Sequence, residues 1–173
     1  LEIVRKPSFR KPIRSKRCLV VADAFIEGTT EEGLRKPYVL YLKNEQRPFA
    51  FAGIWDRWEN KDTGELLESF SIITTVANKL IRKLPHHRSP VILPREAEHL
   101  WLNTEVPMNE VVELLKPYPS EWMNAYPISD KIRNPKAEGR DLIEPTGERL
   151  VPESEFYFRK GLRREGMGNR RKK

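Results

Sequence analysis

The stretch FAFAGIWDRW, residues 49–58, predicts a β-strand with apolar side chains on both of its faces. Side chains alternate along a strand, so every second residue shares a face. One face carries Phe49, Phe51 and Trp55. The other carries Ala50, Ala52 and Ile54. A strand that is apolar on both faces is typical of a buried, central position in a sheet.

Other strand-like runs surround this one in the sequence. They are RCLVVADAFIE (17–27), KPYVLYLK (36–43) and SFSIITT (69–75), and the polar connection NKDTGE resembles a hairpin turn. Four strands before the first helix favour an α+β fold with a mainly antiparallel sheet over an alternating β-α-β arrangement.

The first helix is expected to begin at Thr75, a good N-cap residue. Ala77, Leu80, Ile81 and Leu84 follow at helical spacing, and Pro85 ends the pattern. Further helices are expected over 95–103 and 108–116. The proline-containing run over 7–17 is expected to be an extended basic loop.

The composition limits the class of protein. With 173 residues, 38% of them hydrophobic, and no apolar run long enough to cross a bilayer, we expect a soluble globular protein with no membrane role. The single cysteine, Cys18, lies in an apolar run and is expected to be a small buried residue. It fits a reducing, cytoplasmic setting.

The net charge of +7 is unevenly distributed. Residues 1–17 contain seven Lys/Arg and one Glu, and residues 156–173 contain eight Lys/Arg and one Glu. Residues 18–155 contain 17 Lys/Arg and 23 Asp/Glu, a net charge of −6. Basic ends favour nucleic acid as a partner, although 156–173 is equally typical of a flexible, solubilising tail. We therefore expect one domain over 1–155 and a basic tail over 156–173.

Two side chains are candidates for proton transfer. His86 would follow the C-terminal end of the expected helix, where the helix dipole favours a protonated ring, although its position alone fits a loop histidine that merely caps the helix better. Glu27 closes an apolar strand, which would leave it partly desolvated. The side chain of the neighbouring His87 should diverge from that of His86, and His99 should pack or face water. No spacing of ligands indicates a metal site, and no cofactor is expected.

The order of these sequence blocks resembles the SRAP family, the SOS response-associated peptidases. RCLVVADAFIEG is similar to the family pattern R-C-L-V-P-A-D-G-[FW]-[FY]-E-W, and HHRSPVIL is similar to H-x-R-x-P. In order, KPYVLYL, FAFAGIWDRW, FSIITTVAN and AYPISDKIRNPKAEGRDLIEP extend the resemblance over most of residues 8–145. The resemblance implies that Glu27 and His86 are catalytic and that Thr75 lines the same pocket.

The resemblance also implies a fold and a chemistry. The fold would be a curved, barrel-like antiparallel sheet flanked by helices, with a basic groove for single-stranded DNA. Family members act on abasic sites through an N-terminal cysteine, which forms a covalent thiazolidine crosslink and also explains their self-processing peptidase activity. Arg88, Arg10 and Lys16 would contact phosphates. Such a DNA-repair protein would be cytoplasmic and nucleoid-associated in a bacterium, or nuclear in a eukaryote.

The sequence departs from the family pattern in several respects, among them Val21, Ala24 and Ser89 in place of the usual proline, glycine and methionine. It begins after the family's N-terminal M-C-G-R, so we expect the crosslink to require a longer chain and the 173 residues alone to be inactive. Gly28 replaces the tryptophan that follows the glutamate. An alternative therefore remains, a non-catalytic module of the same fold that binds single-stranded nucleic acid. A conventional peptidase lacks a nucleophile in this sequence.

Overall fold

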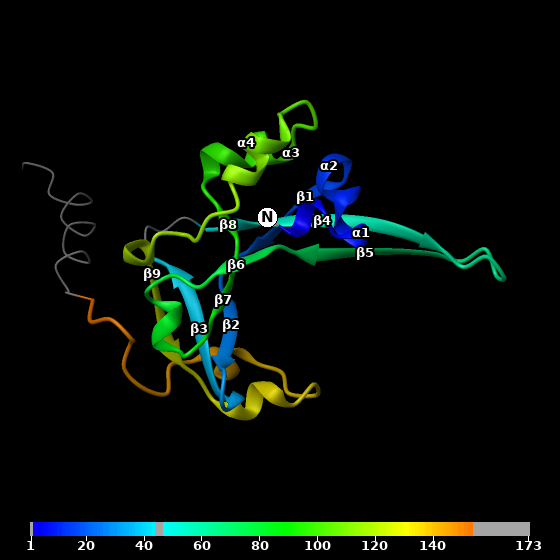
Figure 1. Ribbon diagram of the computed structural model, residues 1–173. Helices are drawn as coiled ribbons and strands as arrows, with labels where there is room; N and C mark the ends of the chain where they lie inside the picture. Colours follow the sequence, from blue (N-terminus) through cyan, green and yellow to red (C-terminus); the bar gives the residue numbers. More distant parts are fainter. Residues whose placement is uncertain (1, 44–46, 154–173) are drawn as a thin grey trace, which may run out of the picture.

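The computed structural model describes residues 2–43 and 47–153 (Figure 1). The strands are β1 (Arg17–Ala22), β2 (Phe25–Thr29), β3 (Gly33–Leu42), β4 (Phe49–Glu59), β5 (Leu66–Ile72), β6 (Thr74–Val76), β7 (Arg88–Pro90), β8 (Ile92–Leu93) and β9 (Met123–Pro127). The helices are α1 (Pro7–Arg10), α2 (Pro12–Ser15), α3 (Glu98–Leu102) and α4 (Met108–Glu113), with short 3-10 helices between elements. The predicted tail, 156–173, lies outside the described residues.

Strand β4 is the centre of the largest sheet, as its two apolar faces predicted. It pairs with β1 on one side and with β5 and β8 on the other, always antiparallel. Residues 49–54 are buried, whereas the outer half of the strand is exposed. There β4 and β5 form a long hairpin that projects from the body (Figure 1). Every residue of β5 is exposed.

The apolar run over 17–27 is two strands and not one. β1 ends at Ala22 and belongs to the sheet of β4, whereas β2 begins at Phe25 and pairs with β3 in a second sheet. β3 pairs in turn with β9, and β6 pairs with β7 as a separate two-stranded unit. Because the chain changes sheets at residues 23–24, Glu27 belongs to the β2–β3 sheet and not to the β4 sheet.

The expected α+β, mainly antiparallel fold is confirmed. All strand pairs among the described residues are antiparallel, and the longest α-helix there has six residues. The pairs form three sheets that do not close into a barrel. No helix among the described residues has the length and apolar character needed to cross a membrane.

Two local predictions were wrong. Thr75 does not cap a helix, because residues 74–76 form β6 and only Ile81–Lys83 form a 3-10 helix. Pairing with the distant β7 overrides the local helical pattern. The basic segment 7–16 is not extended either, since α1 and α2 are one-turn helices that begin at Pro7 and Pro12. Proline favours the first position of a helix, where no N–H is needed.

The buried guanidinium of Arg17 ties the N-terminal helices to the sheet and to α3. Its Nη1 donates to the carbonyl oxygens of Ile13 at 2.7 Å and Arg14 at 3.2 Å. Nε donates to the carbonyl of Trp101, and Nη2 donates to that of Asn103 at 2.5 Å. The side chain therefore satisfies four backbone acceptors at helix ends, and those of Ile13 and Trp101 would otherwise be buried without this donor.

A second anchor holds the segment that follows residue 145 against β3 and β9. Glu153 Oε1 accepts hydrogen bonds from the Tyr41 hydroxyl at 2.6 Å and from Asn124 Nδ2 at 2.8 Å. Burial of this carboxylate opposes its ionisation, but the hydrogen bonds from Tyr41 and Asn124 outweigh that effect and lower the pKa of Glu153. The carboxylate is therefore more stable as an anion in the folded chain than in the unfolded one.

We expect Arg17→Met to lower the free energy of unfolding by about 3 kcal/mol, because it leaves buried carbonyl groups without donors. Denaturant unfolding followed by circular dichroism measures the change. Arg14→Met is the matched control, since the Arg14 side chain is exposed, and it should change stability by less than about 0.5 kcal/mol. Equal stability of the two variants would contradict the anchoring role of Arg17.

We also expect the stabilisation provided by the Glu153 carboxylate to depend on pH. Its pKa is lower in the folded chain than in the unfolded chain, so its contribution is present at neutral pH. The contribution is lost as the pH falls below the ordinary value of 4.5 and through the folded-state pKa. The difference in unfolding free energy between the unsubstituted chain and Glu153→Gln should therefore shrink between pH 7 and pH 3. The exposed Glu148→Gln control should show no such trend.

Candidate active site

The candidate site is built on the segment that connects β6 to β7. Val76 pairs with Arg88, and the Ala77 amide donates to the His87 carbonyl at 3.1 Å, so the two ends of the connection lie side by side. Residues 78–86 therefore form a closed loop, which we call the β6–β7 loop. Contacts between the side chains of this loop and the core fix its position in the molecule.

Three apolar side chains anchor the β6–β7 loop. Leu80, Ile81 and Leu84 are at most 2% exposed and belong to the core cluster that contains Phe49 and Phe51 of β4. The buried Asn78 adds polar contacts. Its Oδ1 accepts from the amides of Leu80 and Ile81, and its Nδ2 donates to the Tyr118 carbonyl at 2.8 Å. The backbone around His86 is therefore held from two sides.

The end of β2 reaches the same loop. The Thr30 hydroxyl, in the turn after β2, donates a hydrogen bond to the carbonyl of Pro85. This contact joins the β2–β3 turn to the residue that precedes His86. Thr30 was not predicted as a site residue, because its role is to hold the backbone of a segment 55 residues away.

Glu27 and His86 face each other, as the resemblance implied. Glu27 Oε1 lies 3.4 Å from His86 Nε2, and the two side chains are 28% and 27% exposed. His86 Nδ1 lies 2.9 Å from the carbonyl oxygen of Arg88. A carbonyl can only accept, so Nδ1 carries a proton. Nε2 is thereby the ring nitrogen that faces Glu27.

His86 is positioned differently from the prediction. It does not follow a long helix, so a helix dipole does not act on it, and its ring bonds forward to Arg88 instead of capping preceding carbonyls. The prediction that His87 diverges was also wrong, since the two rings stack with centroids 5.7 Å apart and an interplanar angle of 11°. Only His86 contacts Glu27. His99 is exposed on α3.

Thr75 and Arg88 line a hollow beside this pair. The hollow has a volume of about 460 Å³ and is also lined by N-terminal residues, among them Ile3, Lys6 and Phe9. The Thr75 hydroxyl donates to the Leu115 carbonyl at 3.2 Å. The Arg88 guanidinium is oriented by bonds to Thr74, with its Nε 2.8 Å from the Thr74 hydroxyl oxygen. Glu27 and His86 do not line the hollow.

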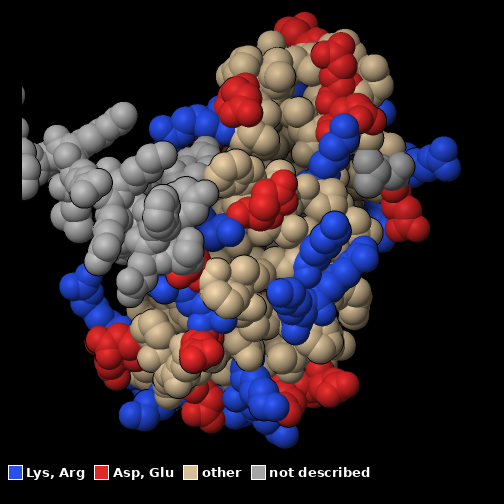
Figure 2. Space-filling view, turned by 90° about the vertical axis from the view of Figure 1, so that its left-hand side faces the viewer, with Lys and Arg blue, Asp and Glu red and all other residues tan. Residues whose placement is uncertain are grey.

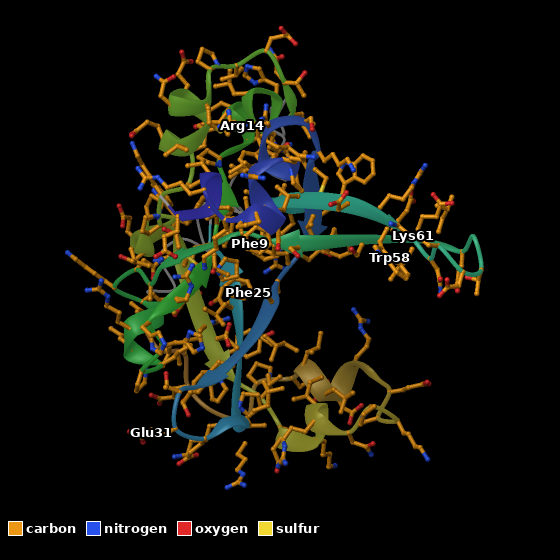
Figure 3. The ribbon with its side chains drawn as sticks, turned by 45° about the vertical axis from the view of Figure 1, so that its right-hand side comes forward. Phe9, Arg14, Phe25, Glu31, Trp58 and Lys61 are labelled. Carbon is orange, nitrogen blue, oxygen red and sulfur yellow. The ribbon has the colours of Figure 1, made fainter. Side chains whose placement is uncertain are left out.

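Arg10 and Lys16 lie away from the Glu27–His86 pair. Arg10 is exposed on α1, and Lys16 follows α2. In Figure 3 the labelled Phe9 and Arg14 of these helices lie well apart from the β2–β3 turn at the labelled Glu31. Lys16 Nζ also contacts Asp56 Oδ1 at 2.5 Å, and this hydrogen bond lowers the pKa of Asp56. A phosphate at Lys16 would compete with that carboxylate.

Gly28 has a steric reason to be glycine. A Cβ atom there would lie 2.2 Å from the carbonyl oxygen of Gly33, far inside van der Waals contact. The pairing of β2 with β3 shifts between Glu27 and Thr29, which brings the Gly33 backbone close. The tryptophan expected from the family pattern therefore cannot fit at residue 28 without rearrangement of this hairpin.

The described residues contain no group of three or more His, Cys, Asp or Glu side chains arranged to hold a metal ion. What the site offers is therefore acid–base chemistry by one carboxyl and one imidazole. Cys18 lies within β1 opposite Gly53, and burial raises the pKa of its thiol. Cys18 is partly exposed and not the buried residue that the sequence predicted, but a thiol with a raised pKa is a poor nucleophile.

Comparison with known proteins gives consistent matches. A family model described as SOS response associated peptidase (SRAP) matches residues 2–135. The abasic site processing protein YoqW of Bacillus subtilis is 41% identical over 141 residues, which are 80% of this chain and 62% of YoqW. The abasic site processing protein HMCES of Gallus gallus is 31% identical over 163 residues, 83% of this chain and 48% of HMCES.

Solved structures agree with the sequence comparison. A protein from Bacteroides thetaiotaomicron superposes with a TM-score of 0.77 at 39% identity, over 84% of this chain and 63% of that one. A protein from Bordetella bronchiseptica gives 0.63 at 26% identity, over 74% and 62%. The chain thus spans less than two thirds of the length of these four proteins.

The hydrogen bond to Arg88 predicts the tautomer of His86. We expect ¹⁵N NMR to show Nδ1 of His86 protonated throughout the neutral range, because it donates to a carbonyl. Glu27→Gln should shift the Nε2 resonance of His86 and leave that of the exposed His99 unchanged. A His86 ring protonated on Nε2 alone would contradict the geometry described above.

Proposed function

The chain belongs to the SOS response associated peptidase family, and from this we propose that it acts on abasic sites in DNA, with Glu27 and His86 as its proton-transfer groups. The substrate proposed is an abasic site in single-stranded DNA. The observation that carries the proposal is the contact of 3.4 Å between Glu27 on strand β2 and His86 on the β6–β7 loop.

An abasic site exposes a sugar aldehyde, and the proposed chemistry uses this group. The α-amine of an N-terminal cysteine attacks the aldehyde and forms an imine with loss of water. The thiol then adds to the imine carbon, its proton passes to the nitrogen, and a thiazolidine ring closes. An α-amine has a pKa of about 8, so a useful fraction is neutral and nucleophilic near pH 7.

Glu27 and His86 would move protons in these steps. Ring opening of the sugar, loss of water and imine formation each need one proton to be given and another to be taken. A carboxyl and an imidazole in contact can do both, and their exposure of just over a quarter leaves them accessible to a substrate. The contact between Nδ1 and the Arg88 carbonyl keeps Nε2 directed at the reacting groups.

Cys18 is not the proposed nucleophile. Its amine is part of a peptide bond inside β1, and it is the only cysteine among the 173 residues. We therefore propose that the crosslink forms in a longer chain that begins with cysteine. Arg88, fixed by Thr74, is a proposed phosphate contact, and Thr75 a proposed pocket residue. Arg10 and Lys16 are proposed phosphate contacts farther along the strand.

One observation favours a second function, a non-catalytic module that binds single-stranded nucleic acid. The close approach of Gly33 excludes the expected tryptophan at residue 28, so the ring that the family pattern places directly after Glu27 is missing. If that ring is needed to place the abasic sugar, the fold would bind DNA without reacting. The two functions differ in whether a covalent adduct forms.

We expect Glu27→Gln and His86→Ala, made in a longer chain that begins with cysteine, to slow crosslinking by about a hundredfold or more, because each removes a proton-transfer group. The measurement is the rate at which a denaturation-resistant adduct forms on single-stranded DNA with one abasic site. His99→Ala is the matched control and should react at the unsubstituted rate.

Three results separate the explanations. Unchanged rates of crosslinking and reversal in both variants would refute the roles of Glu27 and His86. Absence of an adduct with the unsubstituted chain, together with salt-sensitive DNA binding, would favour the non-catalytic module. Absence of both adduct and binding would refute both proposals.

A further inference from the structure

The β6–β7 loop concentrates positive charge that the function above does not use. Residues 78–86 contain Lys79, Arg82 and Lys83, and no Asp or Glu. They lie within residues 18–155, where acidic residues outnumber basic ones by 23 to 17. The loop is therefore a basic segment within a part of the chain that has a net negative charge, and His86 is its last residue.

The loop separates its side chains by type. Leu80, Ile81 and Leu84 point into the core, whereas Lys79, Arg82 and Lys83 are exposed. The hydrogen bonds of Asn78 fix the backbone beneath these cations. A ligand that binds the cations would therefore not have to order the loop first, which lowers the entropic cost of binding. Figure 2 shows one face of the molecule, with Lys and Arg side chains gathered near its centre.

These three cations also lack carboxylate partners within the described part of the chain. Six other Lys and Arg side chains of the described residues have one. The ion pairs are Lys6–Glu2, Lys16–Asp56, Lys36–Glu32, Arg57–Glu68, Lys116–Glu113 and Arg149–Glu153. Across residues 2–43 and 47–153, none of Lys79, Arg82 and Lys83 forms an ion pair. Cations placed together without counter-charges are typical of a surface that binds an anion.

We propose that the β6–β7 loop is a phosphate-binding loop, in which Lys79, Arg82 and Lys83 hold backbone phosphates of single-stranded DNA beside the Glu27–His86 pair. This inference rests on the proposed function and adds a binding site to it. A strand held at the loop would bring successive sugars past His86, so that an abasic sugar meets the proton-transfer pair. The loop would thereby position the substrate without reading its sequence.

Lysine and arginine contacts to phosphates release counterions, and this makes the proposal measurable. For single strands, the slope of log K against log salt concentration changes by about 0.7 per phosphate contact. Loss of three contacts should therefore reduce the slope by about 2. At about 0.1 M salt the dissociation constant should rise by roughly tenfold to a hundredfold.

The test is fluorescence anisotropy of a labelled oligothymidine with the full chain at several salt concentrations. The variant is Lys79→Gln with Arg82→Gln and Lys83→Gln. The matched control is Lys131→Gln with Arg133→Gln and Lys136→Gln, which removes two lysines and one arginine from an exposed segment that also contains Asp130 and Glu138. Lys79→Arg with Arg82→Lys and Lys83→Arg keeps the charge and should keep the slope.

The outcomes distinguish this inference from the function on which it rests. Weaker binding with a reduced slope in the loop variant alone supports the phosphate-binding loop. Binding by the unsubstituted chain that is equally strong in the loop variant refutes the loop and leaves the proposed function standing. Absence of salt-sensitive DNA binding by the unsubstituted chain refutes the proposed function itself.

Discussion

Both faces of β4 must be covered, and the rest of the molecule is arranged to meet this requirement. The Phe49 and Phe51 face packs against apolar residues of the β6–β7 loop and of the β3–β9 sheet. The Ala52 and Ile54 face packs against Trp101 of α3 and Val111 of α4. Burial of such side chains contributes about 1.5–3 kcal/mol each. The loop that carries His86 is therefore held in place mainly because its apolar residues complete the core, and the site depends on a packing constraint.

The elements that could be predicted from sequence are those whose signal is local. The two apolar faces of residues 49–54 predicted a central strand, and runs of β-branched and aromatic residues predicted its neighbours. The failures came from pairings between distant segments. A single polar residue, Asp23, stands in the apolar run at the point where the chain changes sheets. The change occurs because β4 pairs with only six residues of β1, whereas β3 pairs with β2 from Phe25 onward. Residues 75–84 have helical spacing, but pairing of β6 with β7 prevents a helix of that length.

The same contrast between local signals and distant contacts applies to the candidate site. Glu27 and His86 match family positions, so their residue types and order were sufficient, and the structure places them in contact. The groups that hold them were not predictable, because Thr30, Pro85 and the Arg88 carbonyl act through backbone contacts between segments far apart in sequence. The family pattern contains the side chains of Glu27 and His86 but not the backbone contacts that hold them. Gly28 departs from the family pattern, and the structure explains this departure by the close approach of the Gly33 backbone.

The helical spacing that misled the prediction over residues 75–84 has its own explanation. Spacing of apolar residues at i, i+3 and i+4 requires only that one side of a segment is buried, and a loop anchored to a core satisfies this as well as a helix does. In this loop Leu80, Ile81 and Leu84 form the buried side, which leaves Lys79, Arg82 and Lys83 on the other. The apolar residues of this segment thus contribute to stability, and its basic residues would contribute to the proposed phosphate binding. Changes to the cations should leave the core intact, whereas changes to the leucines would displace His86 and the cations together.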